Sequence, residues 1–306
     1  MGKLKRFLTR KDIRFSVLSK LGFFNWMSDE QHIKTKFKYE LGYELDLQNP
    51  KTYNEKIQCL KLHDRRIEYT TLVDKYLVKE YVSSKIGNEH VIPLIAGPFY
   101  SFDDIDFNKL PNQFVLKTNH DCGGIVICKD KNSFDYSKAK RLLEGHLKKN
   151  YYYTCREWPY KNVKPCIFAE EYMSDFDDKG TKGRQLTDYK FICFDGEPKI
   201  VCVCTDRMSG NVKFDYYDMN GEHLPFTWVH PQGDIPGQLP KSFDEMKQYS
   251  KVLSSGCPCV RIDFYESNEK VYFGEITFYH QGGFAKFSPA EWDLKLGDWI
   301  SLKHLV

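Results

Sequence analysis

The sequence predicts an α+β protein with antiparallel sheets, and two observations carry this prediction. Asp195 and Gly196 stand between two runs rich in β-branched and aromatic residues, which is typical of a two-residue hairpin. Residues 66–84 instead repeat apolar side chains near helical spacing and stop before Gly87, which indicates an amphipathic helix. A chain of 306 residues with 41% hydrophobic content can build one composite domain or two closely packed ones.

Four further helices are expected along the chain. Ser242, followed by Asp244 and Glu245 in the first turn, marks the N-cap of one of them. The expected ranges are 10–21, 28–41, 136–149 and 242–254. The first two make the opening of the chain a basic, aromatic and helical segment.

Strands are expected where β-branched and aromatic residues gather in short runs. The expected ranges are 113–117, 125–129, 167–173, 188–194, 199–205, 213–218, 259–265 and 271–277. In the last pair, a three-residue hairpin closed by Ser267 and Val271 would place Asp263 directly opposite Glu275. Opposed carboxylates repel each other unless a cation lies between them. Oxygen ligands favour a divalent cation, most simply Mg2+, and so suggest phosphate chemistry.

Composition narrows the range of partners. The balance of 45 Lys+Arg against 42 Asp+Glu gives a net charge of only +3, so we expect no nucleic-acid partner. The sequence shows no secretory signal and no long apolar run, which favours a cytoplasmic location. The basic opening segment could touch an anionic membrane surface, although a solvated helix face explains it more simply.

Ten cysteines without a C-x-x-C pair indicate buried, reduced thiols and neither zinc nor disulfides.

A second feature with phosphate chemistry lies earlier in the chain. Lys117 ends an expected strand and feeds a polar loop that contains Gly123 and Gly124. Adjacent glycines let backbone N–H groups approach an anion, and the lysine supplies positive charge. Alone this signal is weak, because such a lysine is often a plain surface feature, and the spacing fits neither the Walker A nor the dinucleotide fingerprint. Combined with the carboxylate pair, it matches what ATP requires.

The order of short motifs along the chain resembles the ATP-grasp superfamily, and most closely its TupA-like branch, named for a protein of teichuronopeptide synthesis. The motifs are Asp74-Lys75, Phe114-Val-Leu-Lys117, Ala169-Glu-Glu-Tyr-Met173, Asp188-Tyr-Lys-Phe191, Arg261-Ile-Asp-Phe-Tyr265 and Phe273-Gly-Glu-Ile-Thr-Phe278. The likeness spans roughly residues 50 to 300. It implies two α+β subdomains with antiparallel sheets that clasp ATP, preceded by a helical N-terminal region.

The resemblance also implies roles in nucleotide binding. Lys75 and Lys117 would contact the phosphates of ATP, and the loop with His120, Gly123 and Gly124 would fold over them. The strand that runs into the segment Glu170, Glu171, Tyr172 and Met173 resembles the hinge that meets the adenine edge. Its backbone groups and one acidic side chain, Glu170, would bind the base.

In the same way, Asp263 and Glu275 resemble the Mg2+ ligands, and Arg261 the arginine that steadies the reacting carboxylate or phosphate. Many members of the superfamily place an asparagine two residues after the metal glutamate, whereas this chain has Thr277. A hydroxyl can coordinate a metal directly or through water, so we retain Thr277 as a candidate ligand and leave a second metal's coordination open.

Three further residues are candidates for the chemistry itself. Asp188 and Lys190 alternate on one face of an expected strand, where they are either contacts for the γ-phosphate or acceptor, or a solvated charge pair. Arg207 either binds an acidic substrate or caps a strand end. The residues alone do not decide between these alternatives.

The resemblance implies four segments: residues 1–50, a basic helical N-terminal segment; 51–110, a helical region; 111–173, the small subdomain; and 174–306, the C-terminal subdomain with the metal site. It implies an ATP- and Mg2+-dependent ligase that joins a carboxylate to an amine through an acylphosphate. The partners would be a sugar acid or glycan precursor and an amino acid or amino sugar, in surface polysaccharide synthesis. A kinase-like phosphotransferase, or a glycan-binding protein associated with a glycosyltransferase, are the alternatives.

Overall fold

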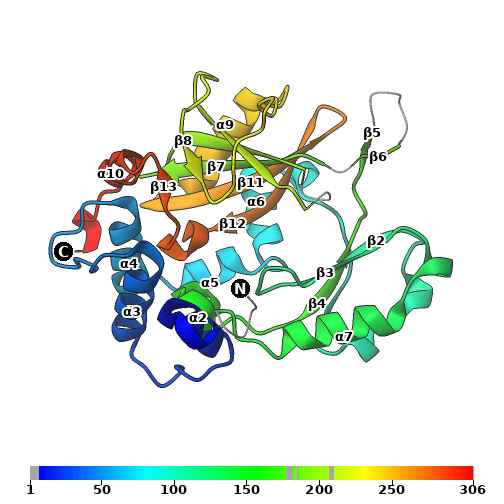
Figure 1. The fold of residues 1–306 in the computed structure, drawn as a ribbon. Helices are drawn as coiled ribbons and strands as arrows, with labels where there is room; N and C mark the ends of the chain where they lie inside the picture. Colours follow the sequence, from blue (N-terminus) through cyan, green and yellow to red (C-terminus); the bar gives the residue numbers. More distant parts are fainter. Residues whose placement is uncertain (1–6, 177–181, 185, 207–209, 306) are drawn as a thin grey trace.

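Two separate antiparallel sheets dominate the fold. The computed structural model describes residues 7–176, 182–184, 186–206 and 210–305. Figure 1 shows the larger sheet in the upper part of the molecule and the smaller one at the lower right, with helices between and around them. The predicted α+β class with antiparallel sheets is confirmed.

The smaller sheet has four strands in the order β1-β4-β2-β3. The strands are β1 (Leu94–Phe99), β2 (Phe114–Thr118), β3 (Ile125–Cys128) and β4 (Ile167–Glu170). Helix α7 (Tyr136–Leu147) packs against β2 and β3, and Leu143 of this helix joins Phe114, Leu116 and Ile167 in the core of this sheet.

The larger sheet has five strands in the order β12-β11-β7-β8-β9. They are β7 (Asp188–Phe194), β8 (Glu197–Thr205), β9 (Lys213–Asp218), β11 (Cys259–Ser267) and β12 (Lys270–Thr277). Helix α9 (Phe243–Ser254) covers one face, where Phe191 contacts Phe243 and Phe264. Since side chains alternate along a strand, Lys190 and Asp263 lie on the opposite face.

The remaining elements are short strands and helices. Two pairs of strands form two-residue to three-residue ladders: β5 (Asp175–Phe176) with β6 (Lys182–Arg184), and β10 (Thr227–Trp228) with β13 (Phe287–Ser288). The other helices are α2 (Lys11–Lys20), α3 (Asp29–Leu41), α4 (Tyr53–His63), α5 (Glu68–Val73), α6 (Val78–Ile86), α8 (Tyr152–Cys155) and α10 (Glu291–Asp298). Helix α4 lies in the region 51–110 that was expected to be helical, but its bounds were not predicted, although Thr52 and Glu55 form a capping box at its start.

The single helix expected over residues 66–84 is wrong, because the chain breaks it into α5 and α6. Asp74 has an extended backbone, and its Oδ1 accepts hydrogen bonds from the backbone N–H of Tyr76 at 2.9 Å and of Leu77 at 3.1 Å. These side-chain hydrogen bonds compete with the helical hydrogen bonds of the backbone, so α5 ends before Asp74 and α6 begins after it. The break turns Lys75 out of the helical path, and its backbone N–H bonds to Asn119 O at 2.9 Å.

Ser242 is the N-cap residue of α9, as expected. Its side chain makes no cap hydrogen bond to α9. Instead, Glu266 on β11 accepts a hydrogen bond from the Ser242 backbone N–H at 2.8 Å. The start of α9 is therefore fixed by the sheet on which it packs, and not by its own first residue.

Helices α3 and α4 pack on the C-terminal part of the chain, whereas α2 packs on α3 and α8. Ile33, Phe37 and Leu41 of α3 form a small core with Phe284, and α4 contacts α10. Strand β1 lies before residue 111 and nevertheless pairs with β4. The segment boundaries at residues 50, 110 and 173 stay a prediction, and a small subdomain defined by its sheet would begin near Leu94.

None of the ten cysteines, which all lie within the described ranges, forms a disulfide, and eight of them are buried. This agrees with the expectation of thiols that behave as small apolar side chains. Within the described ranges, no helix has both the length and the apolar character that a membrane span requires.

Candidate active site

The charged residues of the two sheets meet in a cleft between them. A cavity of about 100 Å³ there is lined by residues of both sheets, the β2–β3 loop and the segment that joins α5 to α6. The predicted site residues in its lining are Lys75, Lys117, Gly123, Glu170, Asp188, Lys190, Asp263 and Glu275. The fold thus brings together residues that lie far apart in the sequence.

Asp263 and Glu275 lie directly opposite each other on β11 and β12, as expected. The turn between the strands differs from the prediction. Ser267 pairs with Lys270, so the hairpin closes with the two-residue turn 268–269 and not with three residues. Both turn residues have positive φ values, 52° and 58°, which is the geometry of a type I′ turn.

A β-bulge at Gly274 makes up the difference in register. Asp263 pairs with Glu275, but Phe264 pairs with Phe273, so Gly274 is the extra residue on β12. A Cβ on Gly274 would lie 3.1 Å from the Asp263 carbonyl oxygen, closer than most side chains allow. Because of the bulge, Asp263 and Glu275 are paired directly across the two strands.

Arg261 binds both carboxylates at once. Its Nε donates to Asp263 Oδ1 at 2.6 Å, and its Nη2 donates to Asp263 Oδ2 and to Glu275 Oε1, each at 2.8 Å. Its Nη1 lies 2.5 Å from Nδ1 of the buried His280. Burial and the nearby Arg261 hold the pKa of His280 well below its usual value, so the neutral ring accepts this hydrogen bond. His280 was missed, because a single histidine after a strand carries no sequence signal.

Lys190 links a third carboxylate to this group. Its Nζ lies 2.6 Å from Asp188 Oδ2 and 2.6 Å from Asp263 Oδ2. Lys190 and Asp188 are both buried, so the alternative of a solvated charge pair is wrong. Burial lowers the pKa of Lys190, but the two carboxylates outweigh it, and the net shift is upward. We call Asp188, Lys190, Arg261, Asp263 and Glu275 the carboxylate cluster.

The carboxylates of this cluster are not equivalent. Burial raises the pKa of Asp263, although Arg261 and Lys190 oppose this shift. Burial also acts to raise the pKa of Glu275, but Lys75, whose Nζ is 3.5 Å away, and Arg261 outweigh it and lower the pKa. The difference follows from geometry, since Asp263 lies deeper and shares both of its cations with other carboxylates.

Three residues from the facing side form a second group, which we call the lysine cluster: Lys79, Lys117 and Glu170. The buried Glu170 carboxylate contacts both lysines, with Lys79 Nζ at 2.9 Å from Oε2. Burial acts to raise the pKa of Glu170, but Lys117 and Lys79 lower it on balance. Lys79 was not among the predicted site residues. The available signal was its place close after Lys75, which was predicted to contact the phosphates.

The β2–β3 loop is held in place by its own side chains. Thr118 Oγ1 donates to Asp121 Oδ1 at 2.5 Å, and Asp121 also contacts His146. Lys75 Nζ donates to the Asp121 carbonyl oxygen at 2.7 Å, which ties the loop to the α5–α6 connection. A Cβ on Gly124 would collide with Thr118 Oγ1, only 1.8 Å away. Glycine is therefore required for this loop to close.

Several predicted residues do not line the cavity. His120 is buried behind the loop, where its Nε2 lies 3.0 Å from the Lys149 carbonyl oxygen. Strand β4 ends at Glu170 and not at residue 173 as expected, so Glu171, Tyr172 and Met173 form the connection that follows it. Glu171 is exposed, and its backbone N–H bonds to Pro93 O at 3.0 Å.

Two predicted residues remain. Thr277 pairs with Arg261 across the sheet, and its Oγ1 donates to Glu275 Oε1 at 3.3 Å. It therefore supports the glutamate in this structure. The prediction for Arg207 lies outside the described residues.

The carboxylate cluster fits Mg2+ only in part. The shared Arg261 Nη2 shows that one cation can reach both Asp263 and Glu275. Oxygen donors of this kind suit Mg2+. However, the described residues include no group of three or more His, Cys, Asp or Glu side chains arranged to hold a metal by themselves. The residues therefore fit a metal that completes its coordination with other oxygens, such as those of ATP phosphates.

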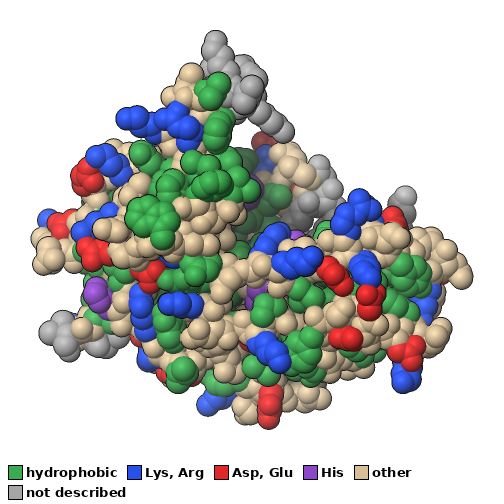
Figure 2. Space-filling view, turned by 90° about the horizontal axis from the view of Figure 1, so that it is seen from below, with side chains coloured by type: hydrophobic (Ala, Val, Ile, Leu, Met, Phe, Trp, Pro, Cys, Tyr) green, Lys and Arg blue, Asp and Glu red, His purple; other side chains and the backbone are tan. Residues whose placement is uncertain are grey.

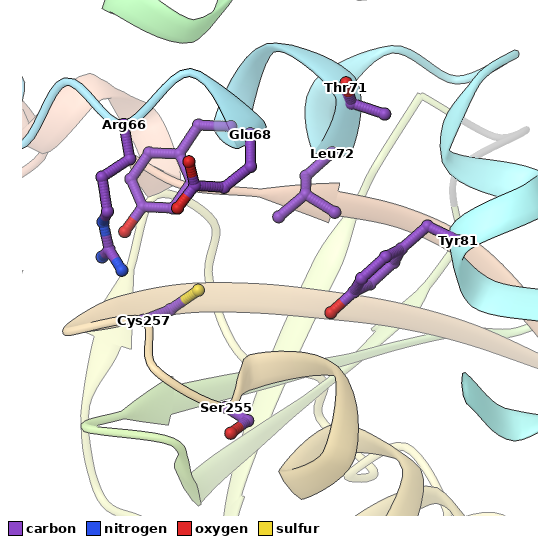
Figure 3. Close-up of a pocket in the computed structure, with 8 residues that line it drawn as sticks. Arg66, Glu68, Thr71, Leu72, Tyr81, Ser255 and Cys257 are labelled. Atoms are coloured by element: carbon purple, nitrogen blue, oxygen red, sulfur yellow. The ribbon is translucent and has the colours of Figure 1, made fainter. Parts of the chain in front are cut away.

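A larger cavity of about 250 Å³ lies elsewhere, between α5, α6 and the start of β11. Figure 3 shows Arg66, Leu72, Tyr81 and Cys257 around it. Arg66 is already bound by Asp64, at 2.8 Å from Nε to Oδ1, and none of the predicted site residues lines this cavity. We therefore place the chemistry in the smaller, charged cleft.

Two antiparallel sheets that enclose lysines on one side and paired carboxylates on the other define an ATP-grasp protein. More specifically, residues 55–301 match the family model described as TupA-like ATP-grasp, so the chain belongs to this family. The resemblance stated from the motifs is confirmed. No curated protein matches the sequence.

The solved structures that this chain resembles are distant from it. D-alanine–D-alanine ligase from Bacillus anthracis, complexed with ATP, shows 15% identity and a TM-score of 0.40, over 68% of this chain and 55% of that one. The same enzyme from Helicobacter pylori shows 15% identity and a TM-score of 0.42, over 81% and 69%. N5-carboxyaminoimidazole ribonucleotide synthetase from Thermus thermophilus shows 11% identity and a TM-score of 0.36, over 68% and 45%. Likenesses this distant say nothing about substrates.

Proposed function

We propose that the protein is an ATP- and Mg2+-dependent ligase that joins a carboxylate to an amine through an acylphosphate. The observation that supports this most is the pairing of two unlike charged groups across one cleft. The lysine cluster has two lysines against one glutamate, a net charge of +1, and the carboxylate cluster has three carboxylates against two cations, a net charge of −1. The first suits phosphates, and the second suits a cation bound to them.

In the proposed reaction, Lys117 and Lys79 bind and orient the phosphates of ATP, and the β2–β3 loop covers them. Mg2+, when bound by Asp263 and Glu275, would neutralise the charge that develops on the phosphates. Arg261 holds both carboxylates in position with its guanidinium N–H groups. Lysines and carboxylates make up most of the polar lining of the cleft, which agrees with catalysis by positioning and preorganised charge.

The proposed reaction has two steps. An oxygen of the substrate carboxylate attacks the γ-phosphorus, the bond to the bridging oxygen breaks, and ADP leaves. The amine nitrogen then attacks the acyl carbon, phosphate leaves, and the nitrogen loses a proton. We propose a sugar acid or glycan precursor as the carboxylate and an amino acid or amino sugar as the amine, in the synthesis of a surface polysaccharide. This choice of substrates rests on the name of the TupA-like branch, which refers to a protein of teichuronopeptide synthesis.

Release of ADP and of free phosphate, measured separately with Mg2+ and ATP, tests the proposal. The protein is given a panel of uronic acids with and without amino acids or amino sugars, and products are identified by mass. We expect ADP and phosphate in equal amounts only when both a carboxylate and an amine are present. A phosphorylated product formed without any amine would contradict the ligase and support a phosphotransferase.

A further inference from the structure

The turn that joins α2 to α3 exposes large apolar side chains. Leu21, Phe23 and Trp26 are 67%, 62% and 79% exposed, and Val17, one helical turn before Leu21, is 39% exposed. Figure 2, seen from below, shows a hydrophobic patch bordered by lysines and arginines on the side of the molecule where α2 lies. A group of exposed aromatic and aliphatic side chains of this size indicates an interaction surface.

The turn presents these side chains in a fixed position. The ring of Phe24 stacks on the buried Phe15 at 4.8 Å between centroids, on the inner side of α2. Buried Arg156 donates through Nη2 to the carbonyl oxygens of Phe24 at 2.8 Å and of Met27 at 3.3 Å. The backbone of the turn is therefore held from inside, so the outward side chains need little further ordering to bind.

The charge around the patch narrows the kind of partner. Residues 7–27 contain four basic residues, Arg10, Lys11, Arg14 and Lys20, and one acidic residue, Asp12. Four positive charges and one negative charge leave +3, which equals the net charge of the whole chain. Asp12 is itself bound by Arg10, at 2.5 Å, while Lys11 and Lys20 are exposed. The apolar patch thus sits on a segment that attracts anions.

We propose that this surface, formed by Val17, Leu21, Phe23 and Trp26 with Lys11 and Lys20, docks the protein on an anionic lipid surface. Aromatic rings of this kind settle at the level of the headgroups, and lysines beside them bind anionic lipids. A second copy of the chain is a poorer partner, because two such segments would bring a charge of +3 against +3. The inference uses no residue of the cleft and does not depend on the proposed reaction.

Flotation of the full chain with lipid vesicles tests this inference. The vesicles contain either phosphatidylcholine alone or phosphatidylcholine with about 30% phosphatidylglycerol, a fraction large enough to give an anionic surface. We expect binding to the anionic vesicles at low salt, a loss of binding as salt rises, and little binding to the neutral ones. Absence of binding to the anionic vesicles, or equal binding to both kinds, would overturn the proposal.

Variants separate the apolar and the basic contributions. Phe23→Ser with Trp26→Ser, and separately Lys11→Glu with Lys20→Glu, should each lower the partition coefficient at least about tenfold. Ile235→Ser is the matched control, because Ile235 is 89% exposed on an unrelated loop, and it should bind as the wild type does. Thermal unfolding confirms that each variant is folded.

Two further outcomes would refute the assignment. Binding that persists in both double variants would mean that another surface contacts the lipid. A wild-type dimer that becomes a monomer when Phe23 and Trp26 are replaced, without any vesicle binding, would make the patch a protein interface. Trp26 fluorescence gives an independent readout, since its emission should shift to shorter wavelength with anionic vesicles only.

Discussion

The two charged clusters of the cleft use the same kinds of side chain and arrive at opposite charge balances. In the lysine cluster one carboxylate, Glu170, is shared by two lysines, and its pKa is lowered. In the carboxylate cluster Lys190 and Arg261 are shared among three carboxylates, and the pKa of Asp263 is raised. The comparison shows that the ratio of cations to carboxylates sets the net charge of each side of the cleft, and so decides whether that side suits an anion or a cation.

This difference has a consequence for the order of binding. The lysine cluster keeps one positive charge in excess and can receive phosphate without further change. In the carboxylate cluster, Arg261 and Lys190 already neutralise most of the negative charge through contacts of 2.6 to 2.8 Å. A metal ion must compete with these side chains, so it should bind weakly until ATP contributes oxygens of its own.

The largest effect is expected in the carboxylate cluster. Asp263→Asn and Glu275→Gln should each reduce turnover on the order of 1,000-fold, because each removes a charge that holds the metal near the phosphates. Glu269→Gln is the control, since Glu269 lies in the turn of the same hairpin and is exposed. Steady-state ADP release measures all three variants. Near wild-type turnover in both Asp263→Asn and Glu275→Gln would remove these residues from the metal site.

A smaller effect is expected in the lysine cluster. Lys117→Met should weaken ATP binding about tenfold to a hundredfold, with Mg2+ and without it, because the lysine acts on the phosphates directly. Lys140→Met, at an exposed lysine of α7 that pairs with Asp103, should leave binding unchanged. Calorimetric titration with ATP distinguishes them. If the Lys117→Met variant lost affinity only when Mg2+ is present, the lysine cluster would not bind phosphate independently of the metal, and the proposed roles of the two clusters would be wrong.

The smallest effect is a difference in acid stability. The pKa of Glu170 in the folded protein is below its ordinary value of 4.5, so its stabilisation is present above pH 4.5 and is lost as the pH falls below it. The free energy of unfolding of Glu170→Gln should therefore fall less between neutral and acid pH than that of the wild type.

Asp263 should behave in the opposite way. Its folded pKa is above its ordinary value of 3.8, so the folded state gains stability from this group as the pH falls through the folded pKa towards 3.8. Asp263→Asn removes that gain and should make the loss of stability in acid steeper. Each unit of pKa difference is worth about 1.4 kcal/mol, which urea unfolding between neutral and acid pH can resolve. Parallel curves for the two variants would contradict the assignment of the shifts.

The sequence predicted much of the carboxylate cluster, because strand register and alternation are local properties. Asp263 and Glu275 were expected opposite each other, and Asp188 and Lys190 on one face of their strand; the structure pairs Lys190 with Asp263 as well. What failed was the path between them. The turn has two residues where three were expected, and the bulge at Gly274, which was not expected, adds one residue to β12. These two differences cancel, so Asp263 still pairs with Glu275. Both the turn, which contains no glycine, and the bulge depend on the packing of the two strands.

The lysine cluster was harder to predict, because it depends on a break in a helix. The apolar spacing of residues 66–84 continues across Asp74, so the pattern gave no reason to divide α5 from α6. The division comes from hydrogen bonds between the Asp74 carboxylate and the next backbone groups. It directs Lys75 towards Glu275 and Lys79 towards Glu170, one to each cluster.

In the proposed function, the two clusters are the phosphate half and the metal half of one ATP site. ATP affinity of the wild type and of Asp263→Asn, each measured calorimetrically with Mg2+ and with a chelator, tests it most directly. We predict that Mg2+ strengthens binding at least about tenfold in the wild type and less than about twofold in the variant, while both bind metal-free ATP equally. An Asp263→Asn variant that keeps the full enhancement by Mg2+ would contradict the claim.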